Sequence, residues 1–83
     1  MEQGALKQRL TRVFRNTFFQ PSLELEETMT ASDVEGWDSL SHINLVLAVE
    51  KEFGISMTTR DVRSLKNVGD LMSLIERKAP QPV

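Results

Sequence analysis

Apolar residues recur along the chain with the three- and four-residue spacing of amphipathic helices. The first such stretch runs from about Glu2 to Phe19, and its opposite side carries Gln, Lys and Arg residues. Pro21 is expected to end this helix, because the residue before a proline is disfavoured in the helical conformation. The residues predicted to face the core are Leu6, Leu10, Val13, Phe14 and Thr17.

A second helix is predicted to begin at Asp38 or Ser39 and to end near Phe53. The Asp38 carboxylate suits the N-cap position, and Gly54 suits the residue that follows a helix C-terminus. On a helical wheel the apolar residues of this stretch fall into two rows. One row has the width of an ordinary core face and consists of Leu45, Val46, Val49 and Phe53. The other, the outer row, lies on a different side and consists of Leu40, Ile43 and Leu47.

Two further helices are predicted in the last third of the chain. Thr58 or Thr59 is expected to cap a short third helix, and Asn67, with Asp70 three residues on, to begin a fourth. The residues predicted to face the core are Val62 and Leu65 in the third helix, and Val68, Leu71, Met72 and Ile75 in the fourth.

The segment from Gln20 to Asp38 has no sustained period and reads as a long loop. Leu23 and Leu25 are expected to hold the loop on the core, and Trp37 to anchor its end. No stretch has the length and alternation of a strand. The sequence therefore predicts an all-α fold: a small four-helix bundle of three main helices and one short helix, with a long loop between the first two. We expect a single domain over residues 1–79 and a frayed tail over 80–83.

Composition narrows the possible functions. The 83 residues include ten Lys and Arg, twelve Asp and Glu, and no Cys. A net charge of −2 disfavours nucleic-acid binding. Arg60, Arg63 and Lys66 are too few to make a DNA-binding helix-turn-helix persuasive. No apolar run approaches the roughly 18 residues of a membrane span. A monomeric cytoplasmic domain without contact to nucleic acid or membrane is the expectation.

Ser39 lies at the first turn of the second helix, where free backbone amides and the helix dipole favour a phosphate. A serine there is most often only a helix-start residue. A nucleophilic serine needs a base and an oxyanion hole. The sole histidine, His42, is near enough to reach Ser39, but it falls on the core side of the wheel and no third group orients it. We expect His42 to be a partly buried packing residue. The outer row either docks a partner or is covered by the long loop, and the pattern alone does not decide between these.

The stretch "GWDSLSHINLVLAVEKEFGI" resembles the core motif of acyl carrier proteins and of the related carrier domains of polyketide and peptide synthesis. Their pattern has Asp-Ser-Leu at the start of the second helix, apolar residues along it, and Glu, Phe and an Ile or Val near its end. The later stretch "LKNVGDLMSLIERK" is similar to the last helix of that family. The resemblance extends from the first helix to Lys78. The residues in register with the motif are Asp38, Ser39, Leu40, Ile43, Leu45, Val46, Leu47, Glu50, Phe53, Gly54 and Ile55.

The resemblance implies a carrier rather than an enzyme. A phosphopantetheinyl transferase, using coenzyme A and Mg²⁺, would attach 4′-phosphopantetheine to Ser39. The thiol of that arm would hold an acyl, aminoacyl or hydroxyacyl group as a thioester for acyl-loading and acyl-transferring enzymes. A chain without cysteine has to import this sulfur. The outer row would then be the surface that partners bind, and Asp38 would cap the helix and assist recognition by the transferase. The scattered carboxylates lack metal-ligand spacing, so no protein-bound metal is expected.

Two departures from the family pattern concern charge. Carriers of bacterial fatty-acid synthesis usually have a strongly acidic second helix, with Glu where this chain has Asn44, and a small polar residue in place of His42. A near-neutral helix argues against long-range steering by basic partners and favours a dedicated pathway, for a secondary metabolite, polysaccharide or modified acyl group. The alternative is an unmodified docking module that binds through the outer row. Such a module would keep its function after Ser39→Ala, whereas a carrier would lose it.

Overall fold

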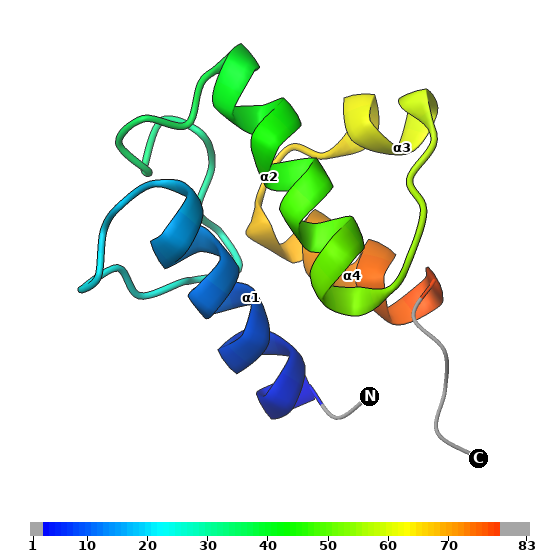
Figure 1. Ribbon diagram of the computed structural model, residues 1–83, viewed down its shortest axis with the longest axis horizontal. Coiled ribbons are helices and arrows are strands. Elements are labelled where there is room, and N and C mark those ends of the chain that lie inside the picture. The colour runs from blue at the N-terminus through cyan, green and yellow to red at the C-terminus, as the bar shows by residue number, and fades with distance from the viewer. Residues whose placement is uncertain (1–2, 79–83) are drawn as a thin grey trace.

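A computed structural model describes residues 3–78 and contains four helices in this range and no strand (Figure 1). The predicted fold of three main helices, one short helix and a long first loop is confirmed. The predicted start of the first helix at Glu2 and the tail at 80–83 lie outside the described residues. The helices are α1 (Gln3–Thr17), α2 (Ser39–Phe53), α3 (Thr59–Ser64) and α4 (Val68–Lys78).

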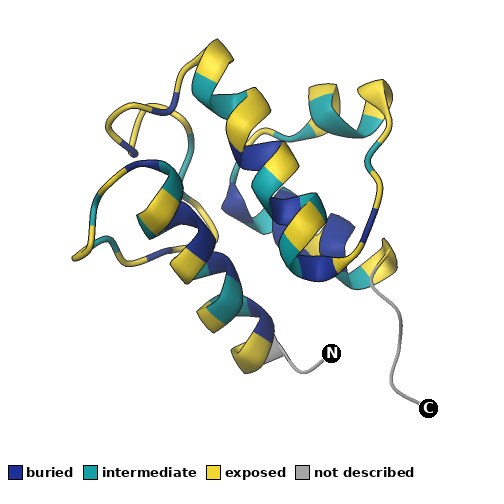
Figure 2. Ribbon diagram, viewed as in Figure 1, coloured by how far each residue is buried: buried dark blue, intermediate teal, exposed yellow. Residues whose placement is uncertain are grey.

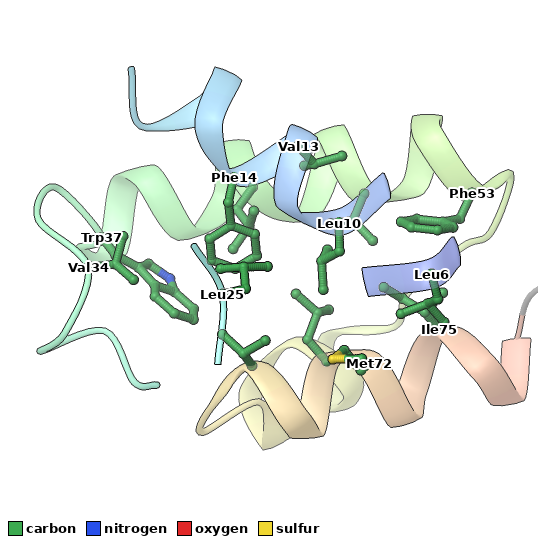
Figure 3. Close-up of a cluster of buried hydrophobic side chains, with 14 of the residues drawn as sticks. Leu6, Leu10, Val13, Phe14, Leu25, Val34, Trp37, Phe53, Met72 and Ile75 are labelled. Atoms are coloured by element: carbon green, nitrogen blue, oxygen red, sulfur yellow. The ribbon is translucent and has the colours of Figure 1, made fainter. Parts of the chain in front are cut away.

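The core lies where α1, α2 and α4 meet, and the long loop closes one end of it (Figure 3). The side chains predicted to face inward from these helices are buried, except that Thr17 is half-buried. Phe18 and Leu74 are also buried, which the pattern did not predict. In the short third helix Val62 is half-buried, but Leu65 follows the helix as its C-cap instead of lying within it. Figure 2 shows the buried positions facing the interior, with exposed positions along the outer side of each helix.

The predicted end of the first helix at Phe19 is wrong, because α1 stops at Thr17. The turn begins before Pro21 is reached. Phe19 takes a left-handed conformation with φ of 55°, and the Gln20 N–H donates to the Arg15 carbonyl at 3.0 Å. This is the arrangement in which helices commonly end on a glycine. Here a phenylalanine occupies the left-handed position, and its side chain is 90% exposed.

The loop between α1 and α2 is held down by apolar and polar contacts, as predicted for Leu25 and Trp37. Leu25, Val34 and Trp37 are buried. Trp37 packs edge-on against Phe14, with ring centroids 5.3 Å apart. The Arg15 side chain donates to the Leu23 carbonyl at 2.7 Å. These contacts fix the path of the loop and therefore the position of Asp38, which begins α2.

The same loop also closes the N-terminus of α4. The backbone N–H groups of Val68 and Gly69 donate to the carbonyls of Met29 and Glu27 at 2.9 and 2.8 Å. These N–H groups lie in the first turn of α4, where backbone N–H groups have no carbonyl acceptor within the helix itself. A Cβ at position 69 would lie 3.1 Å from the Glu27 carbonyl oxygen, so a larger residue would push the loop back by a few tenths of an ångström, and the close approach favours glycine.

Candidate functional site

Asp38 begins α2 as the predicted N-cap. Its backbone is extended, and its carboxylate accepts a hydrogen bond from the Ser41 N–H at 2.9 Å. Its carbonyl accepts from the His42 N–H at 2.8 Å, which starts the helical ladder. The hydrogen bond from the Ser41 backbone is the main cause that holds the pKa of Asp38 below its ordinary value. At the other end, Gly54 has φ of 66° and donates its N–H to the Glu50 carbonyl, as its predicted C′ role requires.

Ser39 is the first residue of α2 and is exposed. Its hydroxyl makes no hydrogen bond with any group in residues 3–78. The neighbouring cap is satisfied by Asp38, so the hydroxyl is not needed to hold the helix end. A side chain that is exposed, unpaired and at the positive end of a helix is accessible to a transferase and favourable for a phosphate.

His42 does not serve Ser39 as a base. Its Nδ1 accepts a hydrogen bond from the Trp37 indole N–H at 3.0 Å. Because an indole nitrogen only donates, the proton of the neutral ring is on Nε2, which lies 3.4 Å from the Val62 carbonyl and donates to it. The ring also stacks on Trp37, with centroids 6.0 Å apart. His42 is half-buried, as predicted, and ties the loop end, α2 and α3 together.

A surface groove of about 760 Å³ runs beside Ser39 between the first turns of α2 and the α3 segment. Sequence reasoning did not predict that α3 would contribute to the site, because the contact between α2 and α3 is set by packing. The only sequence signal that another segment packs beside Ser39 was the predicted partial burial of His42. The groove is lined by Ala31 of the loop, on the α2 side by Trp37, Asp38, Ser39, His42 and Ile43, and on the α3 side by Val62, Arg63, Leu65 and Lys66.

The outer row is exposed: Leu40, Ile43 and Leu47 show 73%, 56% and 59% of their surface. The long loop packs on the core elsewhere and leaves this row uncovered by any segment in the described range. The structure thus decides between the two readings of the row in favour of an open apolar surface. A contiguous apolar surface of this kind is typical of a binding site. Ile43 also lines the groove, so the row and the surroundings of Ser39 are continuous.

Residues 3–78 contain neither a candidate metal site nor a candidate membrane span. Acidic and histidine side chains form no cluster that could hold a metal ion. No helix in this range is long and apolar enough to cross a membrane.

The chain matches the family model described as the phosphopantetheine attachment site, over residues 8–75. It belongs to this family of phosphopantetheine carriers. The acyl carrier protein of Thermotoga maritima is 40% identical over 53 residues, which cover 64% of each chain. That of Solidesulfovibrio magneticus is 40% identical over 43 residues, which cover 52% of this chain and 55% of the relative. In each case the match spans less than two thirds of the relative's length.

A solved structure gives a longer match. The solution structure of a holo acyl carrier protein from Geobacter metallireducens has a TM-score of 0.81 and 39% identity, covering 87% of this chain and 83% of the other. The family is one of carriers that hold 4′-phosphopantetheine covalently, and not of catalysts. The residues present fit this group: an exposed, unpaired hydroxyl stands at a helix N-terminus beside an open groove.

Proposed function

We propose that this chain is an acyl carrier and that Ser39 is where the 4′-phosphopantetheine is attached. One observation carries the proposal. The Ser39 hydroxyl is exposed and unpaired at the start of α2, while the nearby His42 ring has both nitrogens engaged and the Asp38 carboxylate caps the helix. Such a serine suits modification by a separate enzyme better than catalysis of its own.

The residues around Ser39 have separable roles in this proposal. Asp38 orients the first turn through its cap and takes part in recognition by the transferase. The free amides of that turn favour the phosphate of the arm. When bound, the arm supplies a thiol that holds an acyl group as a thioester. The chain itself contains no cysteine to do so.

The partners in this proposal are a phosphopantetheinyl transferase and the enzymes that load and transfer the acyl group. They bind through the outer row of Leu40, Ile43 and Leu47. Residues 1–79 act as one monomeric carrier domain, working in the cytoplasm. Tethering the acyl group raises its effective concentration at whichever enzyme is docked.

The decisive experiment is intact-mass measurement after incubation with coenzyme A, Mg²⁺ and a broad-specificity transferase. We expect one phosphopantetheine adduct on the wild type and none on Ser39→Ala. Ser41→Ala is the matched control, because the cap uses the Ser41 backbone N–H, which alanine keeps. An adduct that persists on Ser39→Ala would show that the arm is attached to another residue. No adduct with several transferases would favour the unmodified docking module instead.

We place the carrier in a dedicated pathway rather than in housekeeping fatty-acid synthesis. This rests on the low charge of α2, whose residues 39–49 contain no Asp, Glu, Lys or Arg. Steering by complementary charge depends on such residues. Expression in a strain depleted of its housekeeping fatty-acid carrier tests the assignment: we expect no rescue of growth although the chain is modified. Rescue would assign it to general fatty-acid synthesis.

A further inference from the structure

The apolar surface beside Ser39 has a positively charged edge on its α3 side. Arg63 and Lys66 line the same groove as Ser39 and Ile43. Both are exposed, and neither side chain forms an ion pair or hydrogen bond with another group in residues 3–78. The acid of this segment, Asp61, is instead paired with Lys78 at 3.0 Å. The two cations are therefore available to a partner.

The acidic residues of α2 do not offset this edge. Glu50 accepts a hydrogen bond from the Met57 backbone N–H at 2.7 Å, and Glu52 is paired with Arg9 at 2.8 Å. Both follow the outer row, near the C-terminal end of the helix. They hold the connection to α3 and the contact between α1 and α2, and they lie away from the residues that line the groove.

Asp38 is the one carboxylate that lines this groove, and both it and the loop residue Asp33 already have local roles. Asp33 accepts a hydrogen bond from the Thr30 N–H at 3.0 Å, and Asp38 caps α2. The α3 side of the groove is thus basic, while its single acid, Asp38, lies at the start of α2 and is engaged by the Ser41 N–H. Opposite charges at the rim of an interface mainly set the partner choice and the rate of encounter.

We propose that the enzymes that dock on the outer row receive it in an apolar pocket whose edge facing α3 carries carboxylates. Arg63 and Lys66 select these partners and orient them on the carrier, and the outer row supplies the apolar contact. The inference rests on the docking role given to the outer row above. It adds the charge of the partner and the two residues that recognise it.

A defined probe makes this testable while the natural partners are unidentified. The probe is a catalytically inactivated broad-specificity phosphopantetheinyl transferase, used as it is and with glutamates introduced along the edge of its carrier pocket that meets α3. Dissociation constants for the apo carrier are measured at low and high salt. We expect the carrier to bind the glutamate form about five- to tenfold more tightly, with the advantage shrinking in high salt.

Charge reversal identifies the residues responsible. Arg63→Glu with Lys66→Glu should reverse the preference, and Arg63→Gln with Lys66→Gln should abolish it. The matched control, Lys7→Glu with Arg12→Glu on α1, makes the same change in net charge away from the groove and should keep the preference. Circular dichroism melting verifies that each variant is folded.

Three results would overturn the inference: a preference unchanged in both groove variants, a preference lost equally in the α1 control, or no binding to either form of the probe. Because the probe is inactive and the carrier is unmodified, these results are independent of whether Ser39 accepts the arm. Intact mass decides that question separately.

Discussion

The two apolar rows of α2 consist of similar residues in opposite environments. Leu45 is 1% exposed and Leu47 is 59% exposed, although they are two residues apart on one helix. Successive positions differ by about 100°, so residues at this spacing point to nearly opposite sides. The buried row belongs to the interior of the bundle, whereas more than half of the surface of each outer-row side chain stays exposed. The first row therefore gains much more free energy from folding than the second, and the second is better explained by binding.

The largest expected effect separates the two rows directly. Leu45→Ala should lower the free energy of unfolding by about 2–5 kcal/mol, because it leaves a cavity in the core. Leu47→Ala is the matched variant and should change it by no more than about 0.5 kcal/mol. Urea unfolding followed by circular dichroism measures both. Equal losses in the two variants would show that the outer row is covered in the folded protein.

Trp37 and His42 link the loop end, the first turns of α2 and the α3 segment beside Ser39. Trp37→Phe keeps an aromatic ring in the core but removes the indole N–H that His42 accepts. We expect the free energy of unfolding to fall by about 1 kcal/mol, the net value of a typical hydrogen bond. Circular dichroism is the measurement, since Trp37 is the only tryptophan and its fluorescence is lost. An unchanged stability would mean that the link between Trp37, His42 and α3 does not help to hold the bundle.

Exposure of an apolar residue does not by itself mark a docking surface, as Phe19 shows. Phe19 is more exposed than any residue of the outer row, but it occupies the left-handed position that ends α1. Phe19→Gly should raise the free energy of unfolding by about 1 kcal/mol by relieving that conformation, and should leave modification of Ser39 unchanged. Gly54→Ala, at the equivalent position of α2, should lower stability by a similar amount. Loss of modification in Phe19→Gly would make Phe19 part of the recognition surface.

The smallest expected effect is on pH dependence and comes from two helix caps. The pKa values of Asp38 and Asp61 are lowered, in each case chiefly by a backbone hydrogen bond, from Ser41 and Thr58 respectively, with Lys78 also acting on Asp61. Their stabilisation is fully present above the ordinary carboxyl pKa of the unfolded chain and is lost as the pH falls through the lowered folded values. Asp61→Asn should therefore flatten the decline of stability in urea titrations below about pH 5. A decline as steep as that of the wild type would remove Asp61 as a contributor.

Most of the local structure follows from residue types that act within one turn of helix. Asp38, Gly54 and the apolar spacing of α2 are sufficient to place that helix, since caps and periodicity are short-range signals. The same signals predicted Thr58 or Thr59 as the cap of α3, which is Thr58 in the structure, and placed Asn67 correctly before α4. The end of α1 was placed two residues late, because Pro21 was the visible signal and a phenylalanine in the left-handed region has no sequence signature.

The candidate site likewise has features that the sequence predicts and features that only the tertiary structure shows. Ser39, Asp38 and the membership of the outer row can be read from one helix and from the family motif. Packing decided that the outer row stays open, that both nitrogens of His42 are engaged, and that Arg63 and Lys66 share a groove with Ser39. Apart from the hydrogen bond between Trp37 and His42, these facts depend on segments far apart in the chain, such as His42 and Val62, and on how the helices and the loop fill the core together. No local pattern encodes that arrangement, so only the folded structure reveals it.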